Sequence, residues 1–530
     1  MISRIRIRLR LSVSLRPHPL NTFFLCLLAA SSFANAADVA LAPAAAKIDG
    51  NALYQANCAS CHGADRLGIN GPALLPGNLE RLRRPDAIKT IAEGRIATQM
   101  PGFGDKLSSA EVTALTELIY TPLATTPAWG MREMRASRIA HQTGKLQDKP
   151  VFKADPLNLF IVVELGDHHA TILDGDKFEP ITRFATRYAL HGGPKFSPDG
   201  RYVYFASRDG WVAKYDIWNL KLISEIRVGI NTRNLAISSD GRYAMIANYL
   251  PHTMVVLDTK NLTPLKIVDV TDDSGKSSRV SAVYDAAPRK SFIAALKDIP
   301  EVWEFSYDAK TDRLNSKKIE EPSFQPRRLR LDDYLDDFFF DASYQHLIGS
   351  SRGGVGQVID LDAGKKITSV ALPGMPHLGS GITWEYQGKP VLATPNLKEA
   401  VVTIVDMNTW QTEKQIPTLG PGFFMRSHEN TPYAWVDVFN GTKDRDVIQI
   451  IDKQKLEVIA QLRPSPGKVA AHTEFTRDGK YALVSIWEND GELVIYDAKT
   501  LQVVKRLPMK KPSGKYNIFN KISRSAGTSH

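Results

Sequence analysis

Two cysteines and a histidine stand close together near the start of the chain, in the segment Cys58-Ala-Ser-Cys61-His62. This C-x-x-C-H spacing attaches haem c, because the two thiols add to the porphyrin vinyl groups and the adjacent imidazole becomes an axial ligand of the iron. Two thiols three positions apart also occur in zinc and thioredoxin sites. The sequence has no second cysteine pair to complete a zinc site. We therefore expect one covalent haem c and electron-transfer chemistry.

A methionine downstream is placed to provide the sixth iron ligand. Met100 opens the segment Met-Pro-Gly-Phe about forty residues after the cysteines, and a thioether opposite a histidine raises the reduction potential of a haem. Ser108 and Glu111 form a helix start signal, and the apolar residues up to Tyr120 predict a closing amphipathic helix. Residues 45–122 resemble the class I cytochromes c. The resemblance implies an all-α domain with His62 and Met100 as the iron ligands.

The first 36 residues are typical of a secretory signal peptide, with five arginines, an apolar run over residues 23–30, and Ala34-Asn-Ala36 as a cleavage site. Cys26 suggests a lipoprotein anchor as an alternative, but the preceding Leu25 is larger than a lipobox allows. No segment approaches the eighteen apolar residues of a membrane span. Since haem c is attached outside the cytoplasm, we expect a periplasmic protein without a membrane span.

Charge and cysteine content narrow the function classes further. Removal of the leader lowers the formal net charge from +10 to +5, which is too mild to indicate nucleic-acid binding. Both remaining cysteines are committed to haem, so we expect no disulfide. The mature chain must be stabilised by core burial, and it is long enough for two domains.

Short alternating strands and repeated turns fill the chain after a linker over residues 123–150. The Asp-Gly turns at Asp199 and Asp240 lie 41 residues apart, and a third copy stands at Asp478. This period is typical of a propeller blade of four strands. Counting weaker copies, residues 151–530 are predicted to form about eight blades. The fold class is therefore mixed, with an N-terminal all-α cytochrome c domain and an all-β eight-bladed propeller.

Four histidines stand at the starts of predicted blades, where turn chemistry does not explain them. A single histidine is usually a structural residue, but four at equivalent blade positions are expected to share one end of the central funnel. A funnel of this kind can hold a large flat ligand. The four residues are His191, His377, His428 and His472.

A covalent cytochrome c followed by an eight-bladed propeller with funnel histidines resembles the cytochrome cd1 nitrite reductase family, whose propeller binds haem d1 non-covalently. The resemblance covers nearly the whole mature chain. It implies that His191, in Arg187-Tyr-Ala-Leu-His191, is the proximal iron ligand of the d1-type haem. It also implies that His377 and His428 are the two distal histidines that serve nitrite in the reductases.

The same resemblance places several side chains around the macrocycle. Arg208, Arg233 and Tyr249 match family positions that line it. Haem d1 carries several carboxylates, so its pocket needs buried cations, and arginine meets this need better than lysine. Arg208, Arg233 and Arg426 are the expected carboxylate-binding residues.

Three segments depart from the nitrite reductases and resemble the dehydrogenases that complete haem d1 biosynthesis, namely residues 163–169, 420–429 and 507–517. The implied reaction desaturates one propionate of bound dihydro-haem d1 to an acrylate, with the loss of two electrons and two protons. His472 or His377 would act as the base, and haem c would take up the electrons. Tyr516 is expected to assist by hydrogen bonding, or only to close the propeller from a C-terminal strand.

Two alternatives stay open from the sequence. A periplasmic nitrite reductase is built from the same parts, and a haem d1 carrier would need only the propeller. The expected partners are the tetrapyrrole substrate, a periplasmic electron acceptor, and nitrite reductase with other proteins of haem d1 biosynthesis.

Overall fold

A computed structural model describes residues 48–69, 71–80, 82–94, 100–125, 127–188, 190, 192–308, 322–351 and 355–523. The predicted signal peptide over residues 1–36 and the predicted iron ligand His191 lie outside these residues. In the described part of the chain, no helix has the length and apolar character needed to cross a membrane.

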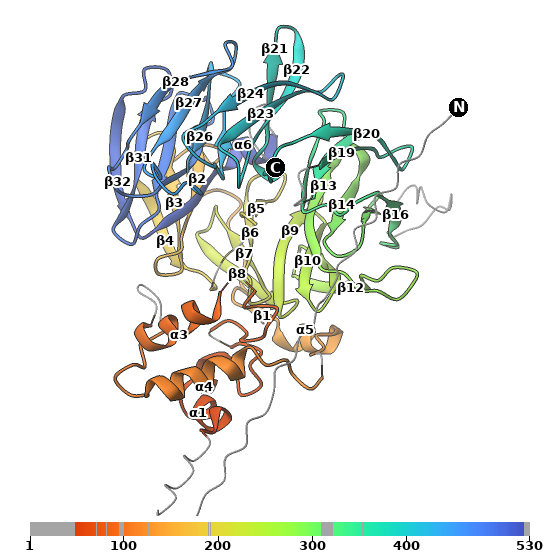
Figure 1. Ribbon diagram of the computed structural model, residues 1–530, viewed down its shortest axis with the longest axis vertical. Coiled ribbons are helices and arrows are strands. Elements are labelled where there is room, and N and C mark those ends of the chain that lie inside the picture. Colours follow the sequence, from red (N-terminus) through yellow and green to blue (C-terminus); the bar gives the residue numbers. More distant parts are fainter. Residues whose placement is uncertain are drawn as a thin grey trace, which may run out of the picture. The chain divides into compact units, whose positions relative to one another are not determined.

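The cytochrome domain is built from four helices, α1 (Gly50–Asn57), α2 (Ala59–His62), α3 (Arg84–Glu93) and α4 (Ser109–Ile119) (Figure 1). The predicted start of α4 is confirmed, because the Ser108 hydroxyl accepts a hydrogen bond from the Glu111 N–H and the Glu111 carboxylate accepts one from the Ser108 N–H. Tyr54, Leu115 and their buried apolar neighbours form the core that these helices share.

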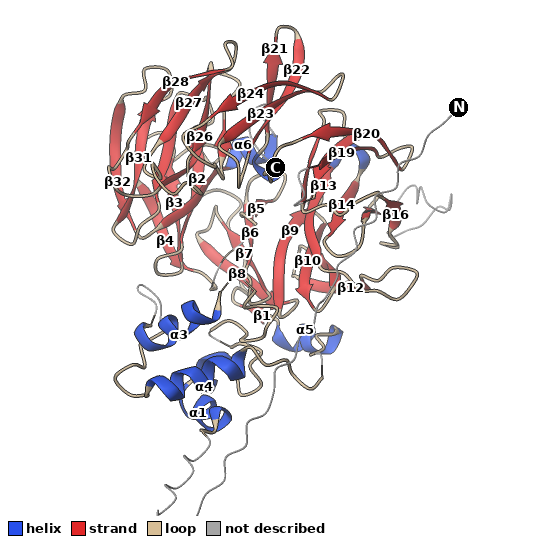
Figure 2. Cartoon of the chain, viewed as in Figure 1, coloured by secondary structure: helices blue, strands red, loops and turns tan. Residues whose placement is uncertain are grey.

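The segment expected to be a linker contains regular structure. Helix α5 (Met131–Ser137) is followed by the two-residue strand β1 (Ile139–Ala140), which pairs with the outer strand of a propeller blade through Ile139 and Glu225. Met134 of α5 is fully buried against the same blade. The connection between the two domains is therefore packed on the propeller (Figure 2).

The described residues beyond the connection form eight antiparallel sheets, which confirms the predicted eight-bladed propeller. In seven blades the strands are consecutive in sequence and the first of them lies innermost, whereas in the remaining blade the innermost strand is the C-terminal one. The first four blades in chain order are β33 (Pro512–Asn517) with β2 (Leu159–Glu164), β3 (His169–Asp174) and β4 (Pro180–Ala185); β5 (Lys195–Phe196), β6 (Tyr202–Ala206), β7 (Trp211–Asp216) and β8 (Lys221–Arg227); β9 (Asn231–Ile237), β10 (Tyr243–Leu250), β11 (Thr253–Asp258) and β12 (Thr263–Asp269); and β13 (Val280–Ala286), β14 (Ser291–Leu296), β15 (Glu301–Ser306) and β16 (Arg327–Arg330).

The remaining four blades follow the same plan. They are β17 (Asp337–Phe340), β18 (His346–Ser350), β19 (Val355–Asp360) and β20 (Lys365–Ala371); β21 (Ile382–Tyr386), β22 (Lys389–Pro395), β23 (Val401–Asp406) and β24 (Gln411–Pro417); β25 (Met425–Arg426), β26 (Tyr433–Asp437), β27 (Ile448–Asp452) and β28 (Glu457–Leu462); and β29 (Ala470–Phe475), β30 (Tyr481–Ile486), β31 (Gly491–Asp497) and β32 (Val503–Met509). Two 3-10 helices, η1 (Ala287–Arg289) and η2 (Leu378–Ser380), stand beside inner strands.

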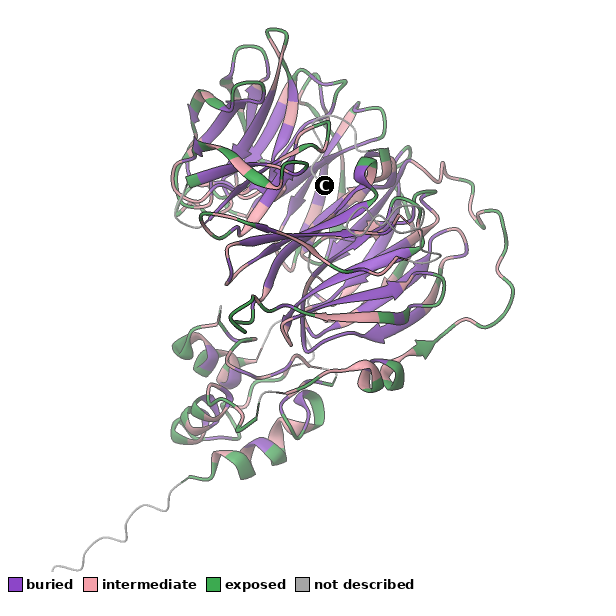
Figure 3. Ribbon diagram, turned by 90° about the vertical axis from the view of Figure 1, so that its right-hand side faces the viewer, coloured by how far each residue is buried: buried purple, intermediate pink, exposed green. Residues whose placement is uncertain are grey.

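The C-terminal strand closes the propeller, as predicted for the strand that carries Tyr516. β33 pairs with β2, and Tyr516 lies opposite Ile161. Helix α6 (Ile518–Ser523) follows directly and packs against β2, β5 and β33. Apolar side chains of neighbouring blades interleave, and buried residues concentrate along the strands (Figure 3).

The repeated Asp-Gly turns have the architectural role that the sequence predicts. At the first copy the Asp199 carboxylate accepts hydrogen bonds from the Ser197 hydroxyl at 2.6 Å and from the Arg201 N–H at 3.1 Å. Gly200 adopts a left-handed backbone with φ of 73°, which glycine adopts at little cost. These turns set the blade spacing and leave the funnel to other residues.

Candidate functional site

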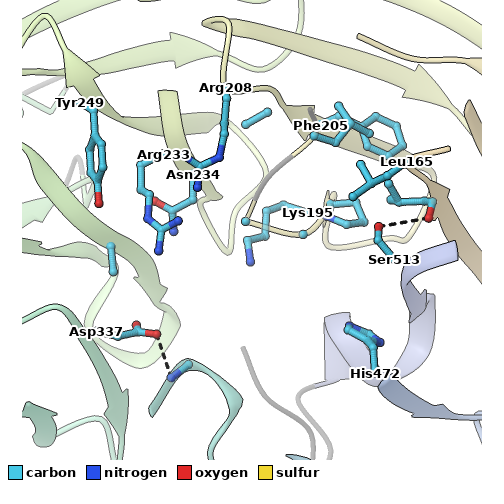
Figure 4. A pocket seen from close by; sticks show the side chains of 18 of the residues that line it. Leu165, Lys195, Phe205, Arg208, Arg233, Asn234, Tyr249, Asp337, His472 and Ser513 are labelled. Atoms are coloured by element: carbon cyan, nitrogen blue, oxygen red, sulfur yellow. Dashed lines mark hydrogen bonds between the residues drawn. The ribbon is translucent and has the colours of Figure 1, made fainter. Parts of the chain in front are cut away.

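One cavity of about 2580 Å³ runs through the funnel and reaches the cytochrome domain. Its cytochrome end is lined by Cys58, Cys61, His62 and Met100. Its propeller end is lined by side chains from inner strands and inter-blade loops, several of which appear in Figure 4. A site for haem c and a site for a second large ligand are therefore continuous with each other.

The cytochrome end has the geometry of an axial histidine ligand. The His62 Nδ1 atom lies 2.8 Å from the Pro72 carbonyl oxygen. Because a carbonyl can only accept, Nδ1 carries the proton and Nε2 is left to ligate iron. Burial lowers the pKa of His62, which favours the neutral imidazole that a metal requires. A side chain at Gly71 would collide with this ring, since its Cβ would lie 2.7 Å from His62 Cε1.

Cys58, Cys61 and Met100 are the other side chains expected to hold haem c. Cys58 is half-buried, and burial raises the pKa of its thiol to about 11, so its surroundings suit a neutral thioether. Cys61 is exposed at the cavity rim. Met100 packs against the core of the cytochrome domain. This donor set of two thiols, one imidazole and one thioether fits haem c.

We expect Met100→Ala to abolish the methionine-to-ferric-iron charge-transfer band and to lower the reduction potential, because a thioether ligand favours ferrous iron. The absorption spectrum of the ferric protein and a redox titration measure both effects. Met131→Ala, in α5 and outside the cavity, serves as the control. An unchanged spectrum in Met100→Ala would mean that another residue ligates the iron.

Cationic and aromatic side chains gather at the propeller end. Arg208, Arg233, Tyr249 and Lys195 point into the cavity (Figure 4). The Arg233 Nε–H donates to the Ser281 carbonyl at 3.2 Å, and its guanidinium lies 5.9 Å from the Tyr249 ring centre. These cations suit a ligand that carries several carboxylates.

Arg426 is a further cation that lines the same cavity. Its side chain is buried, one Nη–H donates to the Met425 carbonyl at 2.9 Å, and its Nε has no hydrogen-bond partner in the described part of the chain. Burial lowers the pKa of this guanidinium, the direction expected for a cation short of partners. An anionic ligand would satisfy it.

His377 lines the cavity beside an aromatic cluster. Its Nδ1 lies 2.6 Å from the Phe423 carbonyl oxygen and therefore carries the proton, so Nε2 is an acceptor. The ring centre lies 4.3 Å from that of Phe423. Burial lowers the pKa of His377, so the imidazole is neutral near pH 7.

His472 and Tyr516 stand together at the wall formed by β29 and β33. Their ring centres lie 5.1 Å apart, and Phe424 contacts the other side of His472 at 4.7 Å. Burial lowers the pKa of His472 well below 6.5 and raises the pKa of Tyr516 to about 12. The pair therefore presents a neutral imidazole beside a protonated phenol. In the described part of the chain, His472 Nδ1 has no hydrogen-bond partner.

His428 does not reach the cavity, contrary to the expectation that it shares the funnel end with the other histidines. It is fully buried beyond β25, its Nδ1 accepts a hydrogen bond from the Asn430 N–H at 3.2 Å, and its ring packs toward Phe475. The turn at Gly479 approaches the ring so closely that no side chain would fit there. The expected pair of distal histidines is therefore not assembled, because only His377 lines the cavity.

Sequence reasoning missed a group of buried charged residues behind the His472 wall: Asp437, Glu474, Lys515 and Lys521. Lys521 of α6 lies 3.5 Å from the Glu474 carboxylate and also lines the cavity. One feature of the sequence indicates these residues: they stand within or next to apolar strands, where an ionisable side chain must be paired. Their partners come from other blades, so the sequence alone does not indicate which residues pair.

Sequence reasoning also missed the contacts that join the domains. The Arg227 guanidinium donates to the Leu67 carbonyl and, at 3.2 Å, to the Gly68 carbonyl, directly after the haem attachment segment. Arg279 and Glu80 form a second link at 2.6 Å. These contacts hold the cytochrome end against the propeller end.

A haem-attachment domain joined to an eight-bladed propeller with a cation-lined cavity defines a redox protein that binds a tetrapyrrole. Residues 154–521 match the Cytochrome D1 heme domain family, and residues 45–119 match the family of the cbb3-type cytochrome c oxidase subunit III. A dihydro-heme d1 dehydrogenase of Pseudomonas aeruginosa is 54% identical over 488 residues, which are 92% of this chain and 97% of that protein. The chain belongs to the cytochrome d1 haem-domain family and, within it, to the dihydro-haem d1 dehydrogenases.

Two further relatives show how specific this similarity is. The solved structure of the dihydro-heme d1 dehydrogenase NirN in complex with DHE has a TM-score of 0.84 and 55% identity, covering 89% of this chain and 99% of that one. The nitrite reductase of Stutzerimonas stutzeri is only 23% identical over 532 residues, which are 89% of this chain and 92% of that protein. The chain is thus much more similar to the dehydrogenases than to this nitrite reductase.

Proposed function

We propose that this protein oxidises dihydro-haem d1 to haem d1 in the propeller cavity. One propionate, –CH2–CH2–COO⁻, becomes the acrylate –CH=CH–COO⁻ with the loss of two protons and two electrons. The observation that carries this proposal is the neutral, buried His472 imidazole beside Tyr516 on a wall of the cavity. The 54% identical dehydrogenase supports it.

In this proposal the residues of the cavity have separate roles in binding and in proton transfer. Arg208, Arg233 and Arg426 bind substrate carboxylates and fix the orientation of the macrocycle. His472 takes one of the two protons from the propionate side chain, and the other passes to water. The protonated Tyr516 donates a hydrogen bond to the His472 imidazole or to the substrate. From the family resemblance we expect His191 to be the proximal ligand of the iron in dihydro-haem d1.

His377 is the other candidate base that lines the cavity. In this proposal its Nε2, which is free to accept a hydrogen bond because Nδ1 carries the proton, contacts the distal side of the ligand. Cys58, Cys61, His62 and Met100 would hold haem c, which when bound would supply a one-electron acceptor that takes the two electrons one at a time and is reoxidised by the periplasmic acceptor after each. The need for such an acceptor explains why the chain carries a cytochrome domain, a feature that a haem d1 carrier would not require.

The alternative activity is nitrite reduction. It needs two distal acids that protonate a small anion at the iron. Of the two expected histidines only His377 lines the cavity, which supports the dehydrogenase over this alternative. To test both activities, purified holoprotein is mixed anaerobically with dihydro-haem d1 and an electron acceptor, and the spectrum of haem d1 is followed. Rapid multiple-turnover reduction of nitrite without oxidation of dihydro-haem d1 would overturn the proposal.

The predicted leader and the covalent haem support a periplasmic location. The partners we propose there are a periplasmic electron acceptor, nitrite reductase as the recipient of haem d1, and other proteins of haem d1 biosynthesis. Fractionation of cells that express the full chain, followed by haem staining, tests the location. Haem-stained protein in the cytoplasmic fraction alone would contradict it.

We expect protonation of His472 to cause no loss of conversion rate as the pH falls from about 8 to 6.5, the range in which an ordinary histidine begins to protonate. Burial, with Lys515, Arg426 and Lys521 nearby, lowers the pKa of His472 well below 6.5. A base is active when it is unprotonated, so a lowered pKa extends activity toward acid pH. A pH–rate profile from single-turnover absorbance measures this. A rate that halves near pH 6.5 would contradict it.

A further inference from the structure

The backbone of His472 departs from the regular strand around it. The ladder between β29 and β30 passes from the Ala471–Ser485 pair directly to the Glu474–Leu483 pair, so His472 and its neighbour form a bulge. His472 also has a left-handed φ of 50°. Its peptide groups are therefore not paired in the ladder and need other partners.

Two fully or nearly fully buried side chains supply these partners. The Asp437 carboxylate, at the end of β26, accepts a hydrogen bond from the His472 N–H at 3.3 Å. The Lys515 Nζ–H groups, on β33, donate to the His472 carbonyl and, at 2.8 Å, to the Ser485 hydroxyl. The His472 backbone is thus held from both sides by residues of two other blades.

Asp437 also organises the aromatic loop that faces His472. Its carboxylate accepts hydrogen bonds from the N–H groups of Phe423 at 2.7 Å and Phe424 at 3.1 Å. The Phe424 ring contacts the His472 ring, and the Phe423 carbonyl accepts the hydrogen bond from His377. One carboxylate therefore connects the backbone segments that contact His377 and His472.

We propose that Asp437 and Lys515 are positioning residues that hold the His472 imidazole in the direction from which it reaches the substrate. The inference rests on the proposed function of His472 as the base. The direction of a side chain follows the φ and ψ of its residue, and a misplacement of about 1 Å at a reacting group costs on the order of a hundredfold in rate. Neither side chain lines the cavity, so both act through His472.

Asp437→Asn is the sharpest test, because it preserves size and removes one acceptor. With its oxygen toward the Phe423 N–H, which makes the shortest bond, the amide would turn its NH2 toward the His472 N–H. We expect the single-turnover rate to fall about 10- to 100-fold while the Kd for dihydro-haem d1 stays within about threefold. Asp174→Asn is the matched control, since Asp174 is a buried carboxylate that accepts two backbone N–H bonds away from the cavity.

Lys515 is tested with two neutral variants. Lys515→Met removes the donor and should slow conversion at least about tenfold with binding retained, whereas Lys515→Gln keeps an N–H donor and should lose less. A wild-type rate in both Asp437→Asn and Lys515→Met would overturn the inference. Parallel losses of rate, binding and thermal stability would also overturn it, because they indicate a purely structural role. A wild-type protein that does not oxidise dihydro-haem d1 would instead overturn the proposed function.

Discussion

Replacement of His472 by alanine should leave dihydro-haem d1 bound but slow its conversion by about two to four orders of magnitude, the usual contribution of a positioned base. The affinity should survive because the cationic residues at the other walls of the cavity are unchanged. An anaerobic absorbance titration gives the Kd, and the appearance of the haem d1 spectrum gives the rate. His472 was one of two candidate bases, so His377→Ala is measured beside it and should lose less.

The control for this experiment is His252→Ala. The His252 ring bonds the Ser277 hydroxyl at 2.8 Å and does not line the cavity, so both the Kd and the rate should equal those of the wild type. A His472→Ala protein that converts its substrate at the wild-type rate would remove His472 as the base. A rate lost in His377→Ala alone would transfer the role to His377.

Replacement of both Cys58 and Cys61 by alanine should reduce turnover of dihydro-haem d1 to background, because it removes the covalent attachment of the electron acceptor. Haem staining of the denatured protein should be lost. The Kd for the tetrapyrrole should change by no more than about threefold, since the two cysteines line the cytochrome end of the cavity and the cationic residues at the propeller end are unchanged. Absorbance under anaerobic conditions follows both quantities.

Ser60→Ala serves as the matched control, because it changes the same segment but keeps both thiols and His62. Its weak contact with the Cys61 sulfur, at 3.9 Å, contributes little. This variant should retain stained haem and turnover. Undiminished turnover in the double cysteine variant would show that electrons leave the cavity without haem c.

The fold was largely predictable because its signals are local. A C-x-x-C-H segment binds its haem through the two thiols and the imidazole of residues that are neighbours in sequence, and each Asp-Gly turn forms from hydrogen bonds within about five residues, as at Asp199. Repetition of such a turn at blade spacing indicated the propeller. The capping box at Ser108 and Glu111 likewise lies within a single helical turn.

The propeller cavity was predictable only in part. The structure brings a set of predicted residues to it, although the roles of these residues stay predictions: Arg208, Arg233, Tyr249, His377, Arg426, His472 and Tyr516. It keeps His428 inside the blade wall. His428 and His472 look alike in sequence, since each stands near the start of a blade. The difference between them arises from a β-bulge at His472, which no local sequence pattern predicts.

Haem c attachment, the propeller fold and membership among tetrapyrrole redox proteins can be predicted from the amino-acid sequence, because these properties depend on short-range motif, turn and repeat signals. Which histidine faces the cavity, and which buried charges stand behind it, depends on long-range packing. Asp437, Lys515 and His472 come from three different blades. Their contacts depend on the ring closing through β33, and such long-range contacts leave no spacing in the sequence from which they could be predicted.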